Sequence, residues 1–283
     1  MQPSTAHCDS QIVKCSTVLA RRRPLVLFCI LTFLFSWGYW GTLLVLGQRV
    51  GPGSNATHLP GLFAPFLSAL ITAALTEGRT GVRRLLVSCM RFPTPRLGWI
   101  LLACSPVLLG IVLFSAAAIT GQGLPSSAAF NTYPGTLSHW PLIAVVLLVL
   151  LVNGVGEEGG WRGYALPLLT QGRSKFSACL FLTAIWLFWH APLFALNQSM
   201  AALLRPALLG WALGLAAGSF LLAWLYWKSQ SVLVVALWHT AFNFVVATEP
   251  GRGMVAAVAS TVVMVIGFAI AVLWWREPEL SKE

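Results

Sequence analysis

Two adjacent glutamates, an arginine and two histidines lie within apolar segments of this 283-residue chain. Glu157 and Glu158 closely follow the run PLIAVVLLVLLV, and Arg162 comes four residues after Glu158. His190 and His239 fall in two later apolar runs. Ionisable groups are costly at such depth and usually mark a functional site. We therefore expect these five residues to contribute to one functional centre.

Helical spacing assigns different partners to the two glutamates. Glu158 and Arg162 are separated by four residues with the acid first, which is the orientation that favours an ion pair on one helix face. Glu157 points about 100° away around the same helix. We expect Glu158 and Arg162 to form a structural ion pair, which leaves Glu157 free.

A free carboxylate and two imidazoles, with no Ser, Cys or Lys nucleophile among them, indicate the activation of water. Glu157 would take a proton from water and return it to a leaving amine, while His190 would help to hold the water. His239 and Asn243, four residues apart, would donate hydrogen bonds to a developing oxyanion. Trp186, four residues before His190, would form an aromatic wall of the pocket. The carboxylate and imidazoles would also suit a Zn²⁺ ion, so the residues leave metal-dependent and metal-free mechanisms open.

Composition places these residues in an integral membrane protein, because 57% of the chain is hydrophobic and only 9% is charged. Soluble domains carry about 25% charged residues. We expect an all-α, polytopic bundle of about eight transmembrane helices, forming one domain over residues 24–275 with its catalytic core at about 140–248. The fourth apolar segment is too long for one perpendicular span, so we expect it to tilt or to break near its glycines. The expected spans are 24–47, 60–77, 98–120, 139–169, 174–196, 206–227, 231–248 and 254–275.

Basic residues predict the orientation in the membrane. With the N-terminus inside, the cytoplasmic segments hold 14 Lys and Arg residues and the outer loops hold three. This asymmetry predicts a multi-pass protein of the cell membrane with cytoplasmic tails at 1–23 and 276–283, the first 20 residues being disordered. It accounts for the net charge of +10 without a nucleic-acid partner. The long apolar run after three arginines, without a cleavage site, predicts a retained first span.

Two further stretches carry weaker structural signals. Residues 77–96 predict a basic, partly amphipathic loop that either rests on anionic headgroups or is simply solvated. Gly210, Gly214 and Gly218 recur every four residues, which favours close helix packing without a chemical role.

Three motifs, in order along the chain, resemble those of the CPBP family of intramembrane proteases. EEGGWR, which begins at Glu157, matches the EExxxR motif, and WHTAFN carries the HxxxN motif at His239 and Asn243. The second motif of the family is FxxxH, where this chain has Trp186 before His190. The family includes the CAAX-processing proteases of eukaryotes and Abi-type bacterial proteins.

This resemblance, which covers roughly 140–248, implies an intramembrane endopeptidase of the CAAX-processing type. Glu157 corresponds to the water-activating glutamate, and His190, His239 and Asn243 correspond to the other catalytic positions. Family members are often described as metalloproteases, although a metal-free mechanism with glutamate-activated water is also argued for them. The implied substrates are peptides or lipid-modified proteins associated with the bilayer.

Two other function classes fit the same residues. A proton-coupled transporter would use Glu157 and His190 as a relay, although the chain lacks the inverted repeats of many transporters. A non-proteolytic scaffold or bacteriocin-immunity protein on the same fold would not need a free Glu157. Cleavage of a peptide distinguishes the protease from both.

Overall fold

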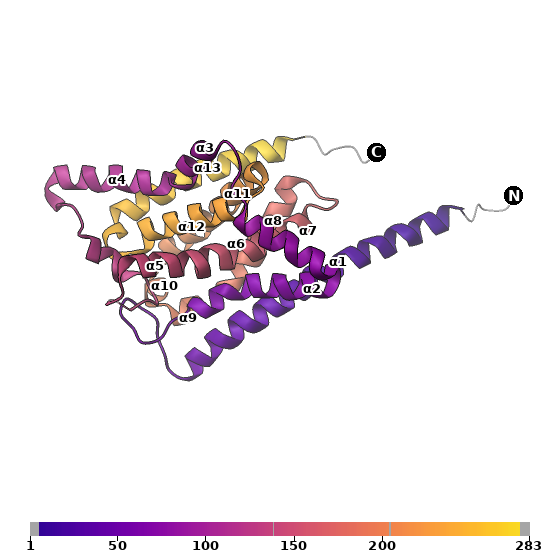
Figure 1. Ribbon diagram of the computed structural model, residues 1–283, viewed down its shortest axis with the longest axis horizontal. Helices are drawn as coiled ribbons and strands as arrows, with labels where there is room; N and C mark the ends of the chain where they lie inside the picture. Colours follow the sequence, from indigo (N-terminus) through magenta and orange to yellow (C-terminus); the bar gives the residue numbers. More distant parts are fainter. Residues whose placement is uncertain (1–5, 138, 204, 278–283) are drawn as a thin grey trace.

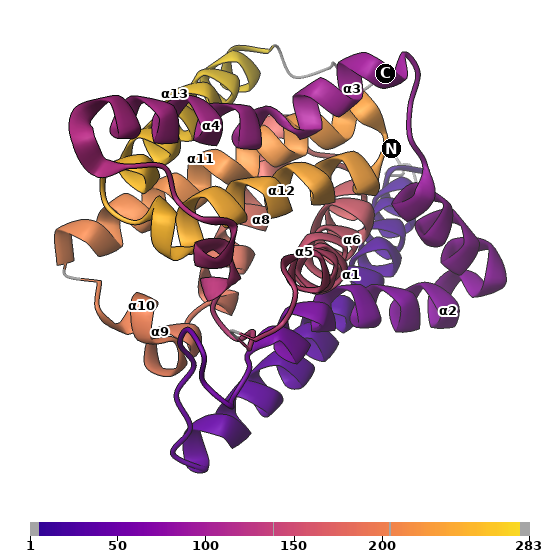
Figure 2. The ribbon, with the colours of Figure 1, turned by 60° about the vertical axis from the view of Figure 1, so that its left-hand side comes forward.

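The protein is an all-helical bundle (Figures 1 and 2). The computed structural model describes residues 6–137, 139–203 and 205–277. Within these ranges the only β-type pairing is an isolated bridge between Val50 and Asn197. Figure 1 shows the beginning of α1, the turn between α7 and α8 and the end of α13 toward the same side of the bundle. Which side faces the cytoplasm stays a prediction.

Each of the eight expected segments is helical. Within the described part of the chain, six helices are long and apolar enough to cross a membrane, or seven if the bent pair α3 and α4 counts as one span. The remaining helix, α12, is shorter at 16 residues, so the number of eight spans stays a prediction. The helices that correspond to the expected spans, the fourth excepted, are α1 (Ala6–Val45), α2 (Leu59–Met90), α3 (Arg96–Ala103), α4 (Ser105–Ala117), α8 (Lys175–Trp189), α11 (Arg205–Ser229), α12 (Val232–Ala247) and α13 (Met254–Arg276).

The fourth expected span is one continuous 28-residue helix, Leu142–Leu169, and it does not break at its glycines. At about 1.5 Å per residue it exceeds the roughly 30 Å of hydrocarbon, so it has to tilt. Two π-helical stretches flank its central α-helical turn, α6. Such π-turns are often found at functional sites. The parts of this helix are α5 (Leu142–Val149), η3 (Leu150–Val155), α6 (Gly156–Gly160), η4 (Trp161–Ala165) and α7 (Leu166–Leu169).

Short helices complete the connections between the spans. They are η1 (Ala118–Gln122), η2 (Ser127–Thr132), α9 (Leu193–Leu196), α10 (Gln198–Ala201) and η5 (Glu249–Gly251).

The N-terminal segment was expected to be a disordered tail, but it is helical from Ala6. Helix α1 begins at Ala6, well before the apolar run, and its first part extends beyond the bundle (Figure 1). No Gly or Pro interrupts residues 6–23, so the helix formed by the first span can propagate through them. Residues 1–5 and 278–283 lie outside the described residues.

One expected boundary is wrong, and one expected span is bent. Residues 77–90 are not a loop, because α2 continues to Met90 after a bend at Gly78, whose φ of 64° suits a residue without a Cβ. The third expected span is two helices, α3 and α4, bent by 49°. Pro106 lies in the first turn of α4, where its missing N–H ends the hydrogen-bond ladder of the preceding helix.

Small residues decide where the helices approach closely. On α6, a Cβ at Gly160 would lie 2.5 Å from the backbone carbon of Pro65 on α2. Gly210 and Gly214 have open space instead, and a Cβ at Gly218 would lie 3.9 Å from Val263 Cγ1, an ordinary contact, so the close packing predicted for these three glycines is wrong. Helices α11 and α13 approach closely at a different position, where the backbone of Ala217 on α11 fills the space beside Gly267 on α13. The glycine face of α6 therefore sets its distance from α2.

We expect Gly160→Ala to destabilise the protein. The added methyl would overlap the Pro65 backbone, which cannot move as a side-chain end can, so the free energy of unfolding should fall by about 1–3 kcal/mol. Thermal unfolding of the detergent-purified protein measures this change. Gly214→Ala is the matched control and should leave the melting temperature unchanged or slightly raised. An equal loss in both variants would contradict the close approach.

Candidate active site

The carboxylate of Glu157 is buried on α6 and is held by two neutral hydrogen-bond donors. Glu157 is only 2% exposed. Asn153 donates from Nδ2 to Oε1, and Trp186 donates from Nε1 to Oε2 over 3.0 Å. Each carboxylate oxygen has further lone pairs, so both remain able to accept a hydrogen bond from a water or a substrate.

Asn153 connects Glu157 to two other parts of the chain. Its Oδ1 accepts hydrogen bonds from Asn243 Nδ2 on α12 and, at 3.3 Å, from the hydroxyl of Tyr133. Asn243 therefore reaches Glu157 through Asn153. Asn153 and Tyr133 were not among the expected site residues. Asn153 precedes Glu157 by four residues, which is a helical spacing that could have revealed it, whereas no sequence signal marks Tyr133.

Glu158 contacts two cationic or ionisable side chains through one oxygen. Arg162 Nη1 lies 3.0 Å from Glu158 Oε1, so the i, i+4 pair is formed, and His239 Nδ1 lies 2.7 Å from the same atom. Both Glu158 and Arg162 are fully buried. Arg162 Nη2 also donates to Ser219 Oγ on α11 at 3.3 Å. These contacts tie α6 to α12 through Glu158 and η4 to α11 through Arg162.

In both His239 and His190, the Nδ1 atom forms a hydrogen bond within the protein. Since an ionised Glu158 oxygen can only accept, His239 donates from Nδ1. His190, the C-cap of α8, donates from Nδ1 to the backbone carbonyl of Trp186 at 2.7 Å. For both imidazoles, the Nε2 atom has no hydrogen-bond partner among the described residues.

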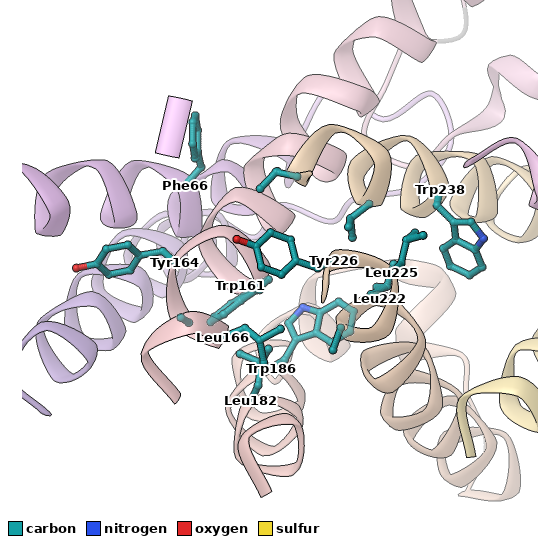
Figure 3. Close-up of a cluster of buried hydrophobic side chains, with 14 of the residues drawn as sticks. Phe66, Trp161, Tyr164, Leu166, Leu182, Trp186, Leu222, Leu225, Tyr226 and Trp238 are labelled. Carbon is teal, nitrogen blue, oxygen red and sulfur yellow. The ribbon is translucent and has the colours of Figure 1, made fainter. Parts of the chain in front are cut away.

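Trp186 contacts Glu157, Arg162 and both histidines of the site, so its expected role as an aromatic wall describes only part of what it does. Besides its bonds to Glu157 and His190, its ring lies 5.6 Å from that of His190 and 5.9 Å from that of His239. The Arg162 guanidinium carbon lies 4.4 Å from its ring centroid, a cation–π distance. Figure 3 shows Trp186 in the buried cluster that also contains Trp161. Four of the expected site residues, Glu157, Arg162, His190 and His239, therefore lie around one indole.

This arrangement does not fit a Zn²⁺ ion. Zinc ligands lie about 2 Å from the metal, so their side chains must converge on one point. Instead the Trp186 ring contacts both imidazoles, and both oxygens of Glu157 are held by protein donors. Over the described ranges, no three His, Cys, Asp or Glu side chains are grouped to hold a metal ion. Glu157, His190 and His239 are not a zinc-ligand set here.

We expect Arg162→Met to lower stability strongly. It would leave Glu158 buried with His239 as its remaining partner, and breaking a buried pair in this way costs about 3–5 kcal/mol. The double variant Glu158→Gln/Arg162→Met should recover part of this loss, because the unpaired charge is gone. Chemical unfolding in detergent measures both.

The exposed pair of Arg84 and Glu77 is the matched control for that test. Arg84 Nη2 donates to Glu77 Oε1 at 2.9 Å, and the arginine side chain is 62% exposed. Arg84→Met should therefore change stability by less than about 1 kcal/mol. Equal effects at Arg84 and Arg162 would contradict the importance of the buried pair.

Comparisons with known proteins point to one family. Residues 139–245 match the family model described as type II CAAX prenyl endopeptidase Rce1-like. The chain is also 26% identical over 232 residues to CAAX prenyl protease 2 of Methanococcus maripaludis, an alignment that covers 77% of this chain and 82% of that protein. The matched residues include Glu157, Glu158, His190, His239 and Asn243. Residues 139–245 are therefore similar to the Rce1-like type II CAAX prenyl endopeptidases, and the described part of the chain has the long apolar helices of an integral membrane protein.

Proposed function

We propose that the protein is an intramembrane endopeptidase in which Glu157 activates the attacking water. The observation that carries this proposal is the unequal treatment of two adjacent carboxylates. Glu158 contacts the guanidinium of Arg162 and the imidazole of His239, whereas Glu157 accepts hydrogen bonds from neutral groups only. Glu157 is therefore the carboxylate that can change its protonation state without breaking an ion pair.

In the proposed reaction, Glu157 takes a proton from water as the water oxygen bonds to the scissile carbonyl carbon. Neutral His190 accepts a hydrogen bond from this water at Nε2, because its Nδ1 hydrogen is directed to the Trp186 carbonyl. The tetrahedral intermediate then collapses with cleavage of the C–N bond. Glu157 returns the proton to the leaving amine nitrogen, which restores its carboxylate.

His239 and Asn243 are proposed to stabilise the oxyanion of that intermediate. Next to Glu158, His239 is assigned as the imidazolium, which donates from Nδ1 to the carboxylate and from Nε2 to the oxyanion. Asn243 uses one amide hydrogen for Asn153 and keeps a second one for the substrate. With Arg162 and His239 positive and both glutamates negative, the buried set is neutral before the reaction.

The substrate proposed is a peptide or protein with a prenylated cysteine near its C-terminus. The choice of a prenylated substrate rests on the name of the relative in Methanococcus maripaludis, CAAX prenyl protease 2, and on the description of the matching family model. A lipid-modified peptide would also partition into the bilayer in which the site lies.

We expect Glu157→Gln to lower the cleavage rate by at least about 100-fold. Glutamine has nearly the same shape but cannot take the proton, and general-base catalysis contributes about 10²–10⁴-fold. The assay is cleavage of a fluorogenic peptide with a prenylated CAAX sequence by the protein in liposomes. Thermal unfolding checks that the variant remains folded.

Glu77→Gln, at an exposed carboxylate, is the control and should keep the wild-type rate. Wild-type activity in Glu157→Gln would refute the mechanism. If the wild-type protein cleaves no peptide but carries pH-dependent flux across the liposome membrane, the protein is a proton-coupled transporter. If it does neither, the scaffold interpretation holds.

We expect Trp186→Phe to lower kcat by about 10- to 100-fold with little change in KM. Phenylalanine keeps an aromatic ring at this position but removes the indole N–H that orients Glu157 Oε2. A hydrogen bond to a charged group is worth about 1.5–3 kcal/mol, and 1.36 kcal/mol corresponds to tenfold in rate. Trp238→Phe, which loses an indole bond to Ser105, is the matched control and should keep kcat. A rise in KM alone would mean that Trp186 only shapes the pocket.

A further inference from the structure

A groove of about 540 Å³ lies at the bend of α2, apart from the carboxylate site. Most of its lining comes from the part of α2 after Gly78, namely Arg79, Val82, Arg83, Leu86, Val87 and Met90. These positions are separated by three or four residues, which places them on one face of the helix. The two arginines lie nearest the bend and the apolar residues follow.

The two arginines of this groove carry free positive charge. Arg84, the third arginine of this helical segment, is paired with Glu77 across the bend. Arg79 and Arg83 are exposed, and neither forms a salt bridge within the described ranges. Arginine binds phosphate groups well because its planar guanidinium donates two parallel hydrogen bonds. The charge of the groove therefore complements an anionic phosphate.

The position of the bend sets the depth of the groove in the membrane. Residues 59–77 of α2 span about 28 Å as a helix, close to the hydrocarbon thickness of about 30 Å. The bend at Gly78 thus falls near the edge of the hydrocarbon, and the last part of α2 turns away from the first (Figure 2). The groove lies where lipid headgroups begin.

We propose that this groove binds an anionic phospholipid. The phosphate lies between the guanidinium groups of Arg79 and Arg83, and the acyl chains lie against Leu86, Val87 and Met90, which remain 39%, 53% and 79% exposed in the isolated protein. A free phosphate would use the arginines but leave the apolar stripe uncovered. A phospholipid would pair its phosphate with the two arginines and cover the apolar stripe with its acyl chains. The groove also lies at the depth of the lipid headgroups.

The test compares lipids and variants by thermal unfolding of the full-length protein in detergent. Phosphatidylglycerol should raise the melting temperature, while phosphatidylcholine with the same acyl chains and inorganic phosphate should not. In Arg79→Gln/Arg83→Gln the apparent affinity for phosphatidylglycerol should fall by about 30-fold. This equals about 2 kcal/mol, from roughly 1 kcal/mol per arginine near the surface and 1.4 kcal/mol per tenfold.

Arg91→Gln/Arg96→Gln is the matched control, because it removes the same charge from exposed positions just beyond the groove. It should keep the wild-type affinity. An equal loss in both double variants would overturn the proposal in favour of non-specific attraction. Stabilisation by inorganic phosphate alone would overturn the assignment to a lipid.

A second measurement needs no variant and therefore does not depend on how the variants fold. A photoactivatable phosphatidylglycerol is crosslinked to the wild-type protein in liposomes, and the labelled peptides are identified by mass spectrometry. Labelling should concentrate on residues 74–90 and should be displaced by unlabelled phosphatidylglycerol more readily than by phosphatidylcholine. Labelling elsewhere, or equal displacement by both lipids, would overturn the proposal.

Discussion

Arg162 and His239 meet on the same oxygen of Glu158, and all three side chains lie deep in the bundle. A carboxylate buried without partners would cost several kcal/mol, so Glu158 requires both contacts to be formed together. Because His239 comes from α12 and Arg162 also reaches Ser219 on α11, this requirement fixes three helices relative to one another. The remaining polar contacts of the site are arranged around that fixed centre.

The same short helix turn serves two purposes. Gly160 allows α6 to lie against the backbone of Pro65 on α2, while Glu157 and Glu158 of the same turn contact Trp186 on α8 and His239 on α12. Close packing against α2 holds Glu157 at a defined distance from Trp186. The π-helical stretches on either side of α6 change the register of the neighbouring residues. Rigid packing therefore positions the polar groups, as a preorganised site requires.

Much of the fold followed from hydropathy, since each apolar segment of sufficient length became a helix. The differences between the expected and the observed helices have local causes that a hydropathy profile does not contain. The bend at Gly78 depends on a positive φ, and the break between α3 and α4 involves the missing N–H of Pro106. The open space beside Gly214 depends on where α13 approaches α11, which a single sequence does not contain.

The sequence by itself determined that a few ionisable residues lie in a membrane bundle and that Glu158 and Arg162 face each other, because helical spacing is a local property. Only the tertiary structure decided which glutamate meets His239 and that the Trp186 indole holds Glu157. Those contacts join residues from different helices, separated by 81 and 29 positions. Their pairing depends on the distance and rotation of packed helices, which local spacing does not specify.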